Sequence, residues 1–313
     1  MGYDALVGVA TVVLAAAVGY AGSLTGPFNV AIAQQIAGLP LYSGLWFRVI
    51  SAGVLFSITA WYLYSYARRV KHDPSKSLVA NVDFSHLELK EDPEKVVMTS
   101  MHKRVLLIFG AALAFMIYAM LKLGFVMADL TAYFIAVAIL IGLFAGMSPG
   151  RIADGFVEGA KSLLYPALLV GFARGIQVVM NDGLIMDALI NGMVQPLSYL
   201  PTLFVPPMMV FVQSFINLII PSSSAMAVVT MPIMTPLADL LHIQRQTACL
   251  AYQYGDGITN LLLPSYSILI GSLGLAKVPF TKWFKFALPL VGILIGAVLV
   301  LSTIAEIIKV GPF

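Results

Sequence analysis

Charged residues and cysteine are both scarce in this sequence, and each scarcity excludes a class of protein. Only 11% of the 313 residues are charged, against about a quarter in an ordinary soluble domain. The single cysteine, Cys249, excludes a disulfide framework and a metal site built from several thiolates. Polar stretches are equally scarce, because residues 70–104 form the only long one. A soluble globular protein is therefore excluded.

Apolar residues are abundant and fall into long runs. Hydrophobic residues make up 60% of the chain, and the mean hydropathy is +0.93. A helix needs about 20 residues to cross a bilayer, and backbone polar groups in hydrocarbon must be hydrogen-bonded within the protein. The sequence thus predicts an all-α polytopic membrane protein. The predicted spans are Val7–Val18 with its flanks, Leu45–Tyr66, Val105–Leu121, Leu130–Met147, Leu163–Met180, Leu203–Ile220 and Phe284–Ile304.

Basic residues concentrate in the polar stretch and predict the orientation. Eight of the 18 lie between Arg68 and Arg104, interleaved with six acids, a mixture that does not suit nucleic-acid binding. By the positive-inside rule the 70–104 loop is cytoplasmic. We expect a multi-pass protein of the bacterial inner (plasma) membrane, with Arg48 near its external side.

The apolar region from 203 to 241 is interrupted at its middle by Pro221-Ser222-Ser223-Ser224. Each half is too short to span a bilayer comfortably. We predict a re-entrant hairpin with the serines at its tip, and two short spans or one kinked helix are the alternatives. A hairpin places the lysines that follow residues 246–275 in the cytoplasm, as the positive-inside rule requires.

Two distant regions resemble each other. Gly22–Phe28 precedes Trp46-Phe47-Arg48, and Gly257–Pro264 precedes Trp283-Phe284-Lys285. Each reads as a helix broken by Gly, Thr and Pro before a long span, and the predicted topology runs them in opposite directions, which is typical of inverted-repeat transporters. The predicted domains are the end of repeat 1 (1–69), the loop (70–104) and a complete repeat 2 (105–313), with its hairpin at about 203–241, broken helix at about 246–275 and final span at 284–309. By symmetry we expect missing residues upstream, so that the chain is N-terminally truncated.

Polar residues inside the predicted spans are candidate binding residues, because they are costly in hydrocarbon. The densest group lies in the second broken helix, and the serines of the hairpin tip are its natural partners. The candidate set is Ser222, Ser223, Ser224, Asp256, Thr259, Asn260, Ser265, Thr25, Asn29, Asn217 and Arg174. The structural alternatives are helix packing, backbone capping and, for Arg174, snorkelling or pairing with Asp182 or Asp187.

Two other function classes compete with transport. An intramembrane aspartyl protease would use Asp4 and Asp256 with Pro166-Ala167-Leu168, but the motif order is wrong and Gln253 stands where a glycine is needed. The sequence contains no zinc-protease helix and no nucleophile elbow, so we do not expect an enzyme. A channel is the other alternative, which saturable uptake with counter-substrate exchange would exclude.

Several motifs also resemble a known family. Ile220-Pro221-Ser222, Thr230-Met231-Pro232-Ile233-Met234 and Gly255-Asp256-Gly257 occur in series, and Ala173-Arg174-Gly175-Ile176 and Asp73-Pro74-Ser75-Lys76-Ser77 match too. Together they resemble the YfcC-like branch of the C4-dicarboxylate anaerobic carrier (DcuC-type) family, in the ion transporter superfamily, over essentially the whole chain.

This resemblance implies a secondary active transporter of small charged metabolites that works by alternating access. The expected substrates are C4-dicarboxylates, with basic amino acids carried by antiport as the alternative. Substrate and Na⁺ would bind between hairpin tips and broken helices. By position, Ser222–Ser224 match the second hairpin tip, Asp256–Pro264 the second broken helix and Gly22–Asn29 the first broken helix. Gly26-Pro27-Phe28 departs from the Asn-Pro-Phe that is common in the family.

The expected site chemistry depends on the substrate. A dicarboxylate predicts a basic site residue, for which Arg174 is the candidate, and a basic amino acid predicts an acidic one, Asp256. No cofactor or metal is expected beyond a coupling Na⁺ or H⁺. The expected partners are a small-molecule substrate and the lipid bilayer, and no nucleic acid is expected. The chain is expected either alone or as a homodimer.

Overall fold

A computed structural model describes residues 3–26, 28–84, 98–119, 123, 125 and 127–311. Every regular element in these ranges is a helix. The chain divides into two compact units, a larger one formed by Met1–Phe84 with Tyr165–Phe313 and a smaller one formed by Ser85–Leu164. The predicted domain boundaries stay a prediction, and residues 85–97 of the predicted loop lie outside the described residues.

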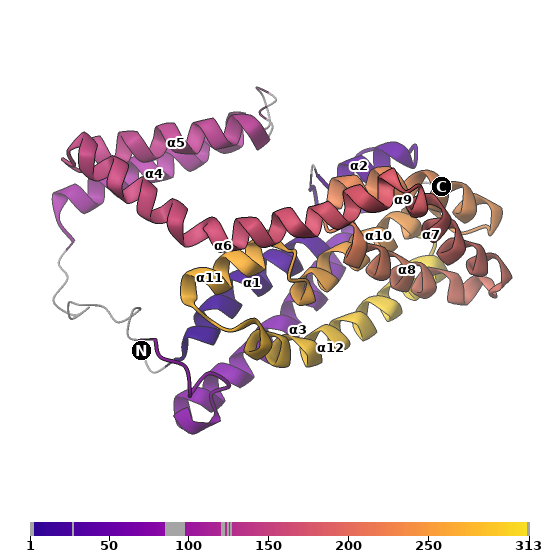
Figure 1. Ribbon diagram of the computed structural model, residues 1–313. Helices are drawn as coiled ribbons and strands as arrows, with labels where there is room; N and C mark the ends of the chain where they lie inside the picture. The colour runs from indigo at the N-terminus through magenta and orange to yellow at the C-terminus, as the bar shows by residue number, and fades with distance from the viewer. Residues whose placement is uncertain are drawn as a thin grey trace. The chain divides into compact units, whose positions relative to one another are not determined.

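The helices of the larger unit account for most of the chain. They are α1 (Ala5–Ala21), α2 (Val30–Ile36), α3 (Leu45–His72), η1 (Pro74–Lys76), α7 (Ile185–Val194), η5 (Gln195–Tyr199), η6 (Thr202–Phe204), α8 (Val205–Ile219), α9 (Ser223–Leu240), α10 (Arg245–Thr259), η7 (Asn260–Leu262), α11 (Ser267–Ala276) and α12 (Phe280–Ile307). The smaller unit contains α4 (Ser100–Tyr118) and α5 (Met127–Phe144), which the Tyr133 hydroxyl joins by donating to the Ala112 carbonyl at 2.7 Å. α6 (Pro149–Asp182) is one continuous helix that begins in the smaller unit and ends in the larger (Figure 1).

Five helical segments of the described chain are long and apolar enough to cross a bilayer. They are Leu45–His72, Thr202–Ile219, Ser223–Leu240, Arg245–Ala276 and Phe280–Ile307, and Ala5–Ala21 and Asp129–Phe144 are shorter apolar helices. The side chains of α3 show why these segments need lipid. Phe56, Trp61 and Tyr64 are 66%, 64% and 65% exposed, and water does not tolerate so large an apolar face. The predicted all-α polytopic membrane fold is confirmed.

The two broken helices enter the larger unit from opposite ends. α1 begins beside the C-terminal end of α3, where Asp4 caps α1 and accepts a hydrogen bond from the Tyr66 hydroxyl at 2.8 Å. α10 begins beside the N-terminal end of α3, where Gln246 Oε1 accepts a hydrogen bond from Ser43 Oγ at 3.0 Å. α1 and α10 pack side by side (Figure 1). The inverted orientation predicted for the two repeats is therefore present in the fold.

The breaks free backbone carbonyl groups, and side chains from other helices satisfy them. At the end of α1, the carbonyls of Ala21 and Ser23 both accept hydrogen bonds at 2.9 Å from Gln253 Nε2 of α10. At the end of α10, the carbonyl of Leu261 accepts a hydrogen bond at 2.8 Å from Trp283 Nε1 of α12. Buried backbone groups without partners are costly in a membrane protein, so these bonds keep both breaks stable.

Helices α8 and α9 form a hairpin around the interruption at Pro221-Ser222. Thr202–Ile219 and Ser223–Leu240 are each long enough to cross a bilayer, so the expectation that each half is too short is wrong, and the re-entrant placement of the hairpin stays a prediction. At its start, Leu203, Phe204 and Pro207 line a cavity together with residues 299–304 of α12. At its end, the backbone N–H of Gln244 donates to Glu306 Oε2 at 3.1 Å, again at the C-terminal end of α12. Both ends of the hairpin therefore lie at one end of the unit. Its tip contacts Asp256, about 16 Å along α10 from that end, which is about half the thickness of a bilayer core.

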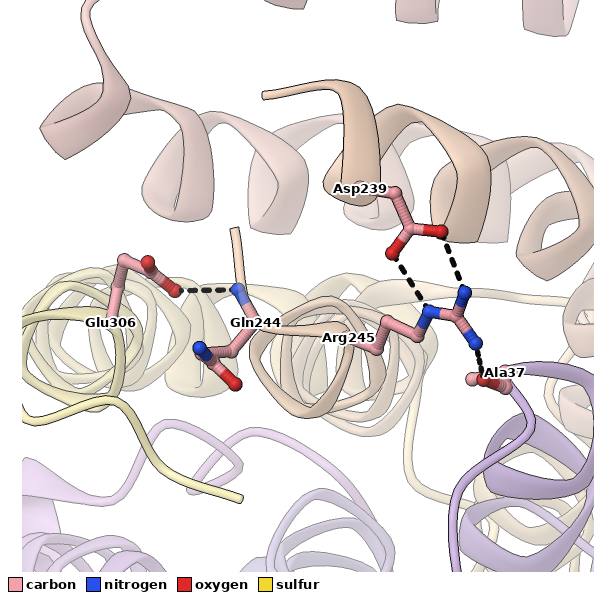
Figure 2. A network of polar contacts seen from close by, with 5 residues as sticks. All are labelled: Ala37, Asp239, Gln244, Arg245 and Glu306. Atoms are coloured by element: carbon pink, nitrogen blue, oxygen red, sulfur yellow. Dashed lines mark hydrogen bonds and ion pairs between the residues drawn. The ribbon is translucent and has the colours of Figure 1, made fainter. Parts of the chain in front are cut away.

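A polar network closes the end of the unit where the hairpin returns. Arg245 binds both carboxylate oxygens of Asp239 at 2.7 Å and donates to the carbonyl of Ala37 at 2.9 Å (Figure 2). Gln244 and Glu306 make the neighbouring contact in the same view. The guanidinium thereby ties the last turn of the hairpin to the C-terminal end of the first broken helix. The sequence gives no local signal for this link, because Ala37 lies far along the chain from Asp239 and Arg245.

Candidate functional site

The hairpin tip and the second broken helix meet at Asp256. Pro221 and the extended backbone of Ser222 interrupt the apolar run, and α9 starts at Ser223. Ser223 Oγ donates a hydrogen bond to Asp256 Oδ2, while the Tyr252 hydroxyl donates to the Ser223 carbonyl at 2.6 Å. The N-terminal end of α9 carries partial positive charge, which stabilises a carboxylate placed there. Asp256 is only 1% exposed, so the tip buries an acidic group in the protein interior.

Asn217 from α8 joins the same cluster. Its Nδ2 lies 3.0 Å from the Asp256 carbonyl, 2.9 Å from Thr259 Oγ1 and 3.0 Å from Asn260 Oδ1. The close approach of α8 to α10 depends on Gly255, because a Cβ there would lie 2.7 Å from the backbone N of residue 214. Four sequence-predicted residues thus join Ser223 in one buried constellation at the second break.

Unpaired oxygen atoms give this cluster its chemical character. Asp256 Oδ1, Asn217 Oδ1 and the neighbouring Gln213 Oε1 are buried and have no hydrogen-bond partner among the described residues. The phenol groups of Tyr20, Tyr252 and Tyr266 lie close enough to Asp256 to interact with it electrostatically. Carboxylate and amide oxygens suit a cation, either a hard ion such as Na⁺ or an organic ammonium or guanidinium group.

The first broken helix contributes a small cavity beside this cluster. Asn29 is buried, donates to the Tyr20 carbonyl at 3.2 Å and caps α2 by accepting from the Val30 N–H at 2.6 Å. Asn29 and Tyr20 line a cavity of 180 Å³ together with Gly19, Ser23, Gly26 and Phe28. Ser23, which lines this cavity, accepts a hydrogen bond at its carbonyl from Gln253 Nε2 at 2.9 Å, so the cavity lies beside α10, the helix that carries Asp256.

Comparison with known proteins identifies the family. Residues 1–310 match the family model described as C4-dicarboxylate anaerobic carrier, DcuC. The chain belongs to this family. A protein of Escherichia coli (strain K12), named "Putative basic amino acid antiporter YfcC", is 31% identical over 305 residues, which cover 94% of this chain and 60% of the relative. An uncharacterized protein of Haemophilus influenzae (strain ATCC 51907 / DSM 11121 / KW20 / Rd) is 34% identical over 313 residues, 97% of this chain and 61% of the relative.

The fold of this DcuC-family chain also has a counterpart among solved structures. The YdaH transporter of Alcanivorax borkumensis matches with a TM-score of 0.53 and 20% identity, over 99% of this chain and 72% of the other. At this identity the likeness concerns the fold alone. The chain spans about three fifths of the length of its curated relatives, 61% and 60%. It is thus a multi-pass membrane protein of a transporter family.

The remaining predicted site residues lie around the constellation or away from it. Ser222 and Ser224 are half-buried at the hairpin tip, and Ser265 is half-buried in the second break. Thr25 lies in the first break and is exposed. Arg174 belongs to the half of α6 in the larger unit, but its side chain lies outside the described residues. The assignment of these residues to a binding site stays a prediction.

The aspartate pair of the protease alternative is not assembled. Asp4 lies at the start of α1, where it accepts hydrogen bonds from Tyr66 and from Ser77 Oγ, the latter at 2.5 Å. Asp256 lies by the other end of α1, and a helix of 17 residues separates the two by about 25 Å. Two carboxyl groups that share one catalytic water must nearly touch, so this motif does not form.

Arg48 is buried, which the sequence did not indicate. It is only 1% exposed within the first turn of α3, and its predicted position near the external side stays a prediction. Arg174 is consequently not the sole basic candidate within a span. The only sequence signal at Arg48 is a charge just inside an apolar run, which interfacial residues share because long basic side chains snorkel.

Proposed function

We propose that this chain belongs to a secondary active transporter that moves small carboxylate-bearing metabolites by alternating access. The proposal rests on the buried polar residues around one acidic side chain, Asp256, which we call the acidic cluster: Asn217, Ser223, Asp256, Thr259 and Asn260. Here a hairpin tip meets a broken helix about halfway along the unit. Broken helices in opposite orientation form substrate and ion sites in many secondary transporters. Rocking of one part of such a fold against another alternates access to a fixed site.

The acidic cluster is proposed as the site of a cation. Asp256, Asn217, Thr259 and Asn260 supply carboxylate, amide and hydroxyl oxygens from two helices. Na⁺ binds such oxygens, and a proton could neutralise Asp256 instead. In the dicarboxylate reading, this coupling ion accompanies C4-dicarboxylates, the substrate class in the family's description.

Transport of basic amino acids is the second candidate function. Here Asp256 would bind the ammonium or guanidinium group of the substrate through a charge-assisted hydrogen bond. The name of the Escherichia coli relative supports the same class. In either case we propose a bacterial inner-membrane location with the 70–104 loop in the cytoplasm, and a monomer or homodimer in the bilayer.

The test is uptake into proteoliposomes that contain the purified chain. Labelled succinate and labelled arginine are supplied separately, with and without an inward Na⁺ gradient. Saturable uptake of one substrate is expected, and Asp256→Asn should reduce it at least about tenfold, because a charged hydrogen-bonding partner contributes about 1.5–3 kcal/mol. Asp154→Asn, which alters an exposed aspartate on α6, is the matched control. Unchanged uptake and ion dependence in Asp256→Asn would refute the assignment.

A further inference from the structure

Arg48 is a buried cation without a buried anion. Its Nε donates to Gln253 Oε1 at 3.1 Å, and its Nη1 donates to the Ser43 carbonyl at 2.5 Å. Its Nη2 is buried and has no hydrogen-bond partner among the described residues. None of the ion pairs found in those residues includes Arg48. A buried charge that is paired only with neutral groups is strongly unfavourable, and such residues in membrane spans mark functional sites.

Gln246 presents a second unpaired donor at the same place. The backbone N–H of Tyr42 donates to Gln34 Oε1 at 2.6 Å, which leaves Gln34 Nε2 to donate to Gln246 Oε1 at 3.1 Å. The oxygen of Gln246 is therefore fixed, and its Nε2, which is buried, has no partner among the described residues.

Both residues contact Ser43, in the turn that precedes α3. Arg48 Nη1 bonds the Ser43 carbonyl, and Ser43 Oγ bonds Gln246 Oε1. Gly44, at φ +71°, packs closely against the Gln246 side chain, since a Cβ there would lie 3.1 Å from Gln246 Nε2. Gln246 also lies in the first turn of α10, where the helix carries partial positive charge. Three features therefore favour an anion: the positive charge of Arg48, the unpaired N–H groups of Arg48 and Gln246, and the N-terminal end of α10.

We propose that Arg48 and Gln246 bind a carboxylate group of the transported substrate. This inference rests on the proposed transport function and adds its anionic subsite. On α10, Gln246 and Asp256 are ten residues apart, a rise of about 15 Å, and Gln253, which holds Arg48, lies between them at about 4.5 Å from Asp256. Hydrogen-bond donors near Gln246 and acceptors near Asp256 would suit a substrate that has both a carboxylate and a cationic group. They would equally suit a carboxylate substrate that binds together with a separate coupling cation. Since the donors are buried, α3 and α10 must separate slightly when the substrate binds.

The test measures carboxylate binding directly, by thermal-shift titration of the detergent-purified chain. The probes are succinate, arginine and agmatine, which is arginine without its carboxylate, at constant ionic strength. The wild-type chain should be stabilised by succinate, and by arginine at lower concentration than agmatine. Arg48→Gln should weaken succinate binding about 10- to 100-fold and remove the difference between arginine and agmatine. Asp256→Asn should retain that difference.

Lys285→Gln is the matched control, because it removes the exposed basic residue of the second Trp-Phe-basic motif. If Arg48→Gln does not purify as a monodisperse protein, Arg48→Lys replaces it in the same titration. Loss of the two-pronged guanidinium group should then weaken succinate binding several-fold. Carboxylate binding that is absent in the wild type or unchanged in the tested Arg48 variant would overturn the inference. Carboxylate binding without any uptake would instead refute the proposed transport and leave the subsite standing.

Discussion

Substitution of Gly257 by alanine tests the contact between the two broken helices. A Cβ at position 257 would lie 2.4 Å from the backbone N of Ala21, 2.5 Å from its Cα and 2.6 Å from its Cβ. Non-bonded carbon atoms normally stay about 3.5 Å apart or more, so the overlap is about 1 Å. The obstructing atoms belong to the backbone of α1 and cannot rotate away. The helices themselves must move apart.

The expected destabilisation follows from this overlap and from helix propensity. Overpacking in a buried site lowers the free energy of unfolding by about 1–3 kcal/mol. Replacing glycine by alanine in a helix raises it by up to about 1 kcal/mol. Gly292→Ala provides the control, since Gly292 lies on the exposed face of α12 with no atom within 4 Å of the added Cβ. The propensity term is the same in both variants. Their difference should therefore approach the full overpacking cost of about 1–3 kcal/mol.

The assay is equilibrium unfolding in mixed detergent micelles, followed by tryptophan fluorescence. Gly257→Ala should unfold at a lower denaturant fraction than wild type, and Gly292→Ala at the same or a higher one. Equal midpoints for the two variants would show that α1 does not approach α10 at Ala21. The arrangement of the two breaks described above would then be wrong, and with it the cavity beside Asp256.

Two further substitutions test other contacts. Asn217→Ala should destabilise the chain by about 1–3 kcal/mol, because it leaves buried acceptors of α10 without their donor. The control in the same unfolding assay is Leu218→Ala, on the exposed face of α8. Arg245→Gln should lower stability by no more than about 1 kcal/mol, because its pair with Asp239 is 38% and 45% exposed. A double-mutant cycle with Asp239→Asn at low and high salt measures this pair, and a salt-independent coupling above that size would contradict the reasoning.

The hairpin and the breaks could be predicted because their signals are local. Pro221 and the serines interrupt an apolar run, and Gly257 and Pro264 interrupt another; each interruption is visible within a few residues. The pairing of the tip with the second broken helix also followed, since buried polar groups need partners. Which tip serine reaches Asp256 depends on the rotation of α9, which the sequence pattern leaves open.

The two Trp-Phe-basic motifs show why the rest could not be predicted. Equal sequence predicts equal roles, but Trp46 is 55% exposed and Trp283 is fully buried. α3 starts one residue before Trp46 and α12 starts three residues before Trp283. The face that each motif turns toward the core is set by how its helix packs against the others, which the motif itself does not contain. Arg48 thereby points into the protein, while Lys285 is exposed.

The break at the end of α10 explains how one helix can serve ligands of both signs. A half-helix carries partial positive charge at its first turn and partial negative charge at its last. In α10 the unpaired Nε2 of Gln246 lies at the first turn, and the unpaired Oδ1 of Asp256 lies at the last, beside that of Asn217 from α8. Were α10 continuous with α11, its negative end would lie about 25 Å further on, away from the acidic cluster. Because η7 and Pro264 end α10 inside the protein, the helix favours a cation there, while its other end favours a carboxylate.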